Sequence, residues 1–124
     1  MPRKTIVNHA PYTVSMNLYV REGYTPGRVR ASIPLRLGPG ASATVEYGDP
    51  HNPLLEGIEL TWIENGARLT HRKLVAQINT PWDDALNRSN GLLIRGTMDI
   101  DAAPMRVSAE AAGIADLGAL QLAG

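Results

Sequence analysis

The sequence predicts an all-β fold, an antiparallel β-sandwich of seven or eight strands with one short helix near residues 81–87. Two observations support this prediction. Apolar and polar residues alternate along several short segments, and turn residues separate these segments at intervals of about eight to twelve residues. With 124 residues and 44% apolar content, the chain is expected to form a single domain, residues 1–124. A small β-barrel is the alternative architecture.

The clearest alternation lies in residues 28–37, which read RVRASIPLRL. One face of this predicted strand is apolar and is expected to meet the core. The other face is polar, and we interpret it as a basic face formed by Arg28, Arg30 and Arg36. Pro34 has no backbone N–H for a ladder hydrogen bond, so it favours an edge strand or a bulge.

Similar patterns predict strands over residues 4–8, 13–20, 43–47, 56–63, 67–78 and 92–100. The dipeptide Asn65-Gly66 tolerates the positive φ of a type I′ turn and therefore predicts a hairpin. The apolar positions change parity within the strand that follows, which predicts a bulge near residues 71–73. Thr80 is a suitable helix cap and Pro81 a suitable first helical residue.

The C-terminal part has a weaker pattern. Residues 104–109 are a candidate last strand, and residues 111–124 are rich in Ala and Gly with four larger apolar side chains. We expect this tail to pack on its own domain or on a partner.

The longer loops indicate where function lies. If consecutive strands are antiparallel, the loops 21–27, 48–55 and 79–91 lie at the same end of the sandwich, and the tight turns lie at the other. Long loops on a rigid scaffold commonly carry binding residues. The sequence therefore predicts a ligand-binding end formed by Tyr24, Asp49, His51, Asn52, Trp82 and Asp84.

These residues also have structural interpretations. Asp49, His51 and Asn52 are metal-ligand types, but Asp and Asn in such loops more often make side-chain turns. Trp82 either stacks on a ligand or covers an open end of the core, and the second role is favoured because Trp is buried on average. Trp62 is in phase with core residues, and Tyr24 is expected to be exposed.

Catalytic motifs are not evident in the sequence. The chain has no cysteine, which excludes thiol catalysis and thiolate zinc sites. Gly-x-Ser-x-Gly is absent, and the glycine-rich stretch 38–42 lacks the lysine of a phosphate loop. We therefore predict no cofactor, and keep a metal-dependent hydrolase as an alternative of lower rank.

Charge is segregated along the chain. Residues 1–36 carry a net charge of +5 and residues 37–67 a net charge of −5. Either the arginines of the basic face pair with Glu46 and Glu59 across a sheet, or basic and acidic faces favour a homo-oligomer. The total charge is zero, which argues against nucleic acid as the main partner.

The first residues, MPRKTIVNHAPYTV, lack the apolar stretch of a secretory signal. No apolar run approaches the roughly 20 residues of a membrane helix. We expect a cytoplasmic protein, or one exported without a conventional signal peptide.

Three phrases within about residues 6–66 carry a resemblance: APYTV, L-x-PG-x-S-x-x-V-x-YG and NP-x-L-x-G-I. They resemble small bacterial β-sandwich proteins without assigned function, and in outline the chain is similar to aegerolysins. The latter resemblance implies a sandwich that contacts membrane lipids. Our leading prediction is a non-catalytic binding or structural protein that self-associates, and a lipid- or carbohydrate-surface binder is the first alternative.

Overall fold

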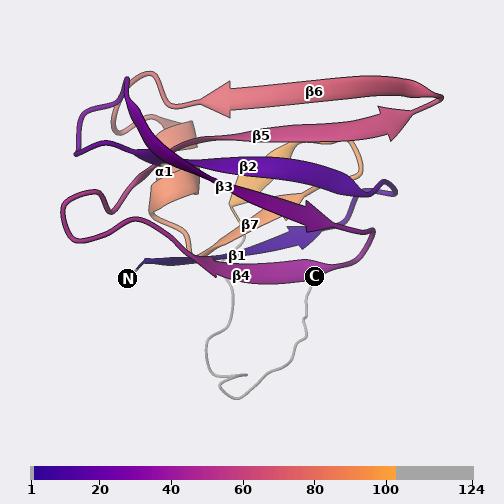
Figure 1. The fold of residues 1–124 in the computed structure, drawn as a ribbon, viewed down its shortest axis with the longest axis horizontal. Coiled ribbons are helices and arrows are strands. Elements are labelled where there is room, and N and C mark those ends of the chain that lie inside the picture. Colours follow the sequence, from indigo (N-terminus) through magenta and orange to yellow (C-terminus); the bar gives the residue numbers. More distant parts are fainter. Residues whose placement is uncertain (1, 103–124) are drawn as a thin grey trace, which may run out of the picture.

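Two four-stranded sheets form the fold of residues 2–102, the part of the chain that this computed structural model describes (Figure 1). One sheet has the strand order β4-β1-β7-β8 and the other has the order β3-β2-β5-β6. The elements are β1 Arg3–Asn8, β2 Val14–Arg21, β3 Val29–Leu37, β4 Ser42–Glu46, β5 Leu55–Glu64, β6 Ala67–Leu74, α1 Pro81–Asn87, β7 Gly91–Ile94 and β8 Ile100–Ala102. The predicted sandwich with one short helix is confirmed, and the sheets do not close into a barrel.

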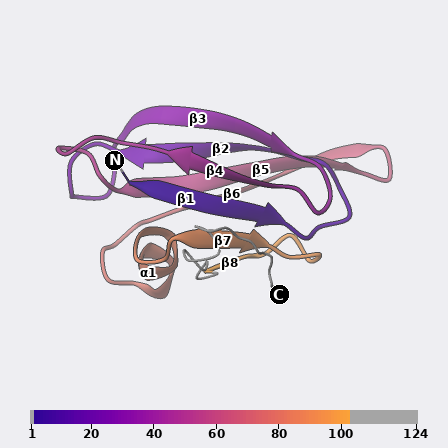
Figure 2. The ribbon, with the colours of Figure 1, turned by 90° about the horizontal axis from the view of Figure 1, so that it is seen from below.

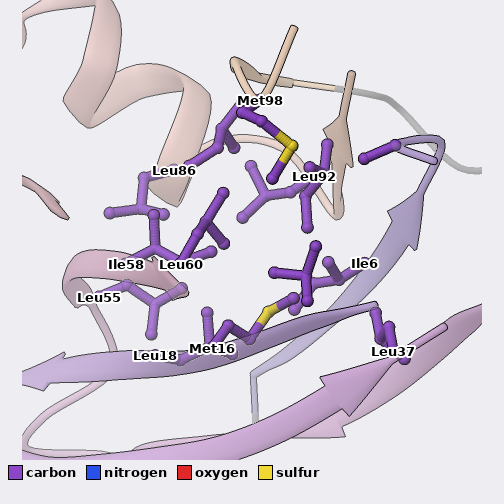
Figure 3. Close-up of a cluster of buried hydrophobic side chains, with 14 of the residues drawn as sticks. Ile6, Met16, Leu18, Leu37, Leu55, Ile58, Leu60, Leu86, Leu92 and Met98 are labelled. Carbon is purple, nitrogen blue, oxygen red and sulfur yellow. The ribbon is translucent and has the colours of Figure 1, made fainter. Parts of the chain in front are cut away.

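The core is mostly aliphatic, because alternate residues of both sheets point between them and the chain has no Phe. Side chains from β1, β2, β5 and β7 meet there, and Leu86 of α1 joins them (Figure 3). Trp62 is buried with this cluster, as the sequence predicted. Figure 2 shows α1 beside β7 and β8, on the side of the molecule away from β3.

The strand at residues 28–37 is less buried than its alternation suggests. Ile33 and Leu35 pack partly on the core and Leu37 is buried, but Val29 is 48% exposed and Ala31 is exposed too. The expectation that the whole apolar face meets the core is therefore wrong for its first half. The strand is β3, an edge strand, so Pro34 predicted its position correctly.

Asn8 joins the two sheets at the end with the tight turns. Its buried amide nitrogen donates to the carbonyls of Tyr12, Leu37 and Gly38 at 2.9, 3.0 and 3.1 Å, and its oxygen accepts from the Ala10 N–H at 2.9 Å. One side chain thus fixes both connections between the sheets at this end.

The hairpin and the helix start follow the sequence prediction. Asn65 and Gly66 have φ of 54° and 79°, as a type I′ turn requires. Thr80 caps α1 by accepting a hydrogen bond from the Asp83 N–H at 3.2 Å, and Pro81 is its first residue.

Four expectations are corrected. The predicted strand over 67–78 ends at Leu74. Its pairing with β5 has no bulge near residues 71–73. Leu74 and Ile78, whose change of parity suggested the bulge, are exposed, so no bulge is needed to bury them. The predicted strand over 92–100 is instead the hairpin of β7 and β8, turned at residues 95–99. The antiparallel expectation fails for β1 and β7, which pair in parallel although they are far apart in the sequence.

The candidate strand at 104–109 and the tail at 111–124 lie outside the described residues. Within residues 2–102, no helix has the length and apolar character needed to cross a membrane.

The close approach of β5 and β6 depends on Gly57. A Cβ at this position would lie 2.6 Å from the Lys73 carbonyl oxygen and 2.5 Å from the Leu74 Cδ2. We expect Gly57→Ala to lower the free energy of unfolding by about 1–3 kcal/mol, since a crowded backbone must move. Gly96→Ala is the matched control, because a Cβ at Gly96 would have no atom within 4 Å. Urea denaturation of both variants measures the difference, and equal stability would contradict this account.

Candidate functional site

The three longer loops meet at one end of the sandwich, as the sequence predicted, and the buried side chain of Arg21 links them. Its Nε donates to Glu56 Oε1 at 2.8 Å and one terminal nitrogen donates to Asp83 Oδ1 at 3.1 Å. The guanidinium also reaches the carbonyls of Tyr24 and Leu55. Arg21 is 0% exposed, so this network is a desolvated ion cluster.

The partners of Arg21 extend the network into the surrounding segments. Glu56 Oε2 accepts from the Gly27 N–H at 2.7 Å, which fixes the loop before β3. Burial opposes ionisation of Asp83, but hydrogen bonds from Asn79 and Asn87 and the charge of Arg21 outweigh it and hold its pKa below the usual range. Asn87 then bonds both backbone groups of Leu55, so α1 is tied to β5.

A double irregularity in β2 explains why Arg21 points inward. The register shifts between Tyr19 and Val20 in the ladder with β5, and between Val20 and Arg21 in the ladder with β3. Strict alternation would place Val20 and Arg21 on opposite faces, yet both are buried. The bulge therefore redirects Arg21, which is a common use of bulges near functional sites.

Lys4 is a second buried cation at the same end. Its side chain is 1% exposed, its Nζ donates to the Ser89 carbonyl, and it lies 6.0 Å from the centre of the Tyr47 ring. Burial lowers the pKa of Lys4 to about 8. Lys4 is in phase with Ile6 and Asn8 along β1, so its alternation was a signal for burial that our sequence interpretation missed.

The Asp49–Asn52 segment is a side-chain turn. Asp49 Oδ1 accepts from the N–H groups of His51 and Asn52 at 2.8 and 2.9 Å, and from the Asn52 amide at 3.0 Å. The Asn52 amide is the main cause that lowers the pKa of Asp49. Asn52 Oδ1 is also occupied, because it accepts from the Gly23 N–H at 2.7 Å. His51 is exposed, and residues 2–102 contain no group of three His, Asp or Glu side chains able to hold a metal.

The remaining predicted ligand residues have different environments. Tyr24 is 62% exposed, and its hydroxyl donates to the Pro50 carbonyl at 3.4 Å. Trp82 is partly buried against the core, and the Lys73 Nζ lies 4.5 Å from the centre of its ring. Asp84 forms an ion pair with Arg88 at 3.2 Å. The structure thus brings Tyr24 to the Asp49–Asn52 turn, whereas Trp82 packs against the core.

The charge segregation is largely neutralised within the molecule, but not by the predicted pairs. Glu46 pairs with Arg3 and Glu59 with Arg72, rather than with the arginines of β3. Arg30 lies 3.8 Å from Asp49. Together with Arg21 and Glu56, these pairs engage four of the five acids in residues 37–67.

Arg28, Arg36 and Arg68 have no carboxylate partner among the described residues, and two of them share a surface. Arg36 and Arg68 line the same grooves on the outer face of the β3-β2-β5-β6 sheet, together with Ser15 and Thr61. The register places Arg36, Ser15 and Thr61 side by side across three strands. We call these four residues the arginine groove.

Glu59 also lines one of these grooves, and its carboxylate already has hydrogen-bond partners. Glu59 Oε2 accepts from two nitrogens of Arg72 at 2.7 and 3.1 Å, and its Oε1 accepts from Tyr19 and Asn17. The hydrogen bond from Arg72 is the main cause that lowers the pKa of Glu59. A carboxylate in this state is a weak base, so Glu59 is poorly suited to abstracting protons.

Comparisons with protein-family models, with curated proteins and with solved structures gave no match.

The buried ion cluster makes Arg21 a strong determinant of stability. Arg21→Met is expected to lower the free energy of unfolding by about 3–5 kcal/mol, because it leaves Glu56 and Asp83 without their cation in a desolvated site. Arg3→Met is the control, since the exposed Arg3–Glu46 pair is worth at most about 1 kcal/mol. Chemical denaturation at neutral pH compares the two, and similar losses would disprove the central role of Arg21.

The lowered pKa of Lys4 predicts a pH dependence. Below pH 8 the amine is charged in both folded and unfolded chains, so the burial cost is fully present. Between about 8 and 10.5 the folded amine is neutral while the unfolded one still holds its proton, so the free energy of unfolding rises with pH. The rise is about 1.4 kcal/mol per pH unit in this interval.

We therefore expect the wild-type protein to gain roughly 1–2 kcal/mol between pH 7.5 and about 9.5, and Lys4→Met to lose that gain. The range stays below pH 10 because burial raises the pKa of Tyr47, which lowers stability at higher pH. Lys73→Met, which removes an exposed lysine, should keep the gain. Urea titrations at several pH values measure it, and a persisting rise in Lys4→Met would exclude this amine as its source.

Proposed function

We propose that this chain is a non-catalytic binding module that takes an anionic group in the arginine groove. The observation that supports this most is the pairing pattern of the arginines. Six of the nine described arginines have carboxylate partners, and two of the other three line the same grooves.

The chemistry of the groove fits an oxyanion. A guanidinium presents several N–H donors in a planar fork that matches carboxylate, phosphate and sulfate oxygens. The hydroxyls of Ser15 and Thr61 lie between the two arginines and add neutral donors. Because the side chains come from strands of one sheet, the groove is formed before the ligand arrives.

The loop end supports a second candidate, a lipid- or carbohydrate-surface binder. Tyr24 is the most exposed of the large hydrophobic residues in residues 2–102, and Arg28 in the same loop region has no carboxylate partner there. An aromatic ring beside a cation suits an interfacial contact.

Self-association remains a prediction. The ion pairs within the chain reduce the charge complementarity on which it was based.

Titration with inorganic phosphate, followed by calorimetry or by NMR shifts, tests the arginine groove. We expect Arg36→Gln and Arg68→Gln each to weaken binding about tenfold or more, since each removes a charge-assisted hydrogen bond. Arg3→Gln is the control, because Arg3 already pairs with Glu46. If Tyr24→Ala abolishes binding and the two groove variants do not, the loop end is the site and the proposal is wrong.

A further inference from the structure

We propose that β6 binds an extended acidic segment of a partner protein, which adds to the sheet as a fifth strand. This inference rests on the proposed anionic partner and specifies its chemistry and its mode of attachment. It depends on three features of β6: an unpaired backbone edge, the direction of its free hydrogen-bonding groups, and its charge.

The first feature is the free edge. β6 is the last strand in the order β3-β2-β5-β6, and it lies along the upper margin of the molecule in Figure 1. All of its eight residues except His71 are exposed. Among residues 2–102 its ladder partner is β5 alone. The other edge of this sheet, β3, is interrupted by Pro34, whereas β6 has no proline and therefore keeps every N–H group that faces its free edge.

The second feature is the direction of the free groups. The Val75 N–H bonds the Glu56 carbonyl at 2.8 Å, and the register from Gly57–Leu74 to Glu64–Ala67 is uninterrupted. In an antiparallel ladder, alternate residues direct both backbone groups to the same neighbour. Residues in phase with Val75 therefore face β5, and the intervening residues Arg68, Thr70, Arg72 and Leu74 direct their N–H and C=O groups to the free edge.

The third feature is charge. β6 reads ARLTHRKL, with three permanently basic residues, one histidine and no acid. Arg68 and Arg72 lie on the outer face with Thr70 between them, at residues that also present their backbone to the free edge. Arg72 donates from Nε and one terminal nitrogen to Glu59, its guanidinium lies 6.0 Å from the centre of the Tyr19 ring, and its side chain is exposed. Arg68 is exposed and forms no ion pair within residues 2–102.

These features define the incoming segment. An antiparallel strand would place residues opposite Arg68 and Arg72, and these partners would be four positions apart in the segment. Carboxylates at both positions would form cross-strand ion pairs on the outer face, next to the arginine groove. Main-chain hydrogen bonds supply affinity in this mode and alternate side chains supply specificity.

A second copy of this chain fits the edge poorly. Two-fold antiparallel pairing of β6 about Thr70 would set Arg68 of each copy opposite Arg72 of the other. Like charges directly opposite are destabilising. Charge complementarity therefore favours an acidic partner.

The test uses the full chain and two acetylated, amidated peptides, TEVTVET and TEVPVET. They have the same charge and length, but the second lacks the central N–H and resists an extended ladder. We expect TEVTVET to bind at least about tenfold more tightly, because strand addition needs these backbone bonds. Thr70→Pro, which removes a free-edge donor, should weaken TEVTVET to a similar degree and leave inorganic phosphate binding unchanged. Thr70→Val, which keeps the N–H, is the control.

A second measurement keeps the test valid if Thr70→Pro fails to fold. In the wild-type chain, TEVTVET should slow amide exchange at Arg68, Thr70, Arg72 and Leu74. Equal affinity for the two peptides, or no change in exchange, overturns strand addition even where phosphate still binds. A wild-type dimer that Thr70→Pro converts to monomer identifies a second copy as the occupant and also overturns it. Absence of phosphate binding overturns the proposed function itself.

Discussion

The arrangement of the loop end depends on one buried cation, Arg21. Its guanidinium joins the end of β2 to Glu56 of β5 and to Asp83 of α1, and through Glu56 it fixes the approach to β3. A cation in this position needs both carboxylates, because a buried charge without partners costs several kcal/mol. The bonds of Arg21 to Asp83, and of Asn87 to the Leu55 N–H, hold α1 against β5, and the chain then continues from α1 into β7.

The opposite end is fixed by neutral groups. Asn8 satisfies three carbonyls and one N–H from the connections between the sheets. The ion cluster of Arg21 thus stabilises one end of the sandwich and the Asn8 amide stabilises the other, with a mostly aliphatic core between them. Most polar side chains of the loop end that the sequence suggested for ligand binding instead form hydrogen bonds or ion pairs within the protein. Asp49 and Asn52, for example, bond each other and the neighbouring backbone.

Alternation along the chain was sufficient to predict the fold class, because period-two burial is a local consequence of strand geometry. Local turn chemistry likewise predicted the Asn65-Gly66 hairpin and the start of α1. The site was harder to predict. Arg21 becomes buried through a bulge, which depends on how two ladders fit around β2 and has no signature in residues 14–21. The arginine groove needs the sheet order, since Arg36 and Arg68 lie on opposite edge strands.

The basic residues of β6 have two consequences with one physical origin. An exposed edge strand invites pairing with any other strand, and positive charge on that edge is a common means of preventing it. The protection is selective, because the same charges repel a basic copy and attract an acidic segment. Arg68 lies on this edge and also in the arginine groove, so the residue that discourages self-pairing is one that the proposed anion would contact. Selectivity at this surface would then come from repulsion of unsuitable partners as much as from attraction of the suitable one.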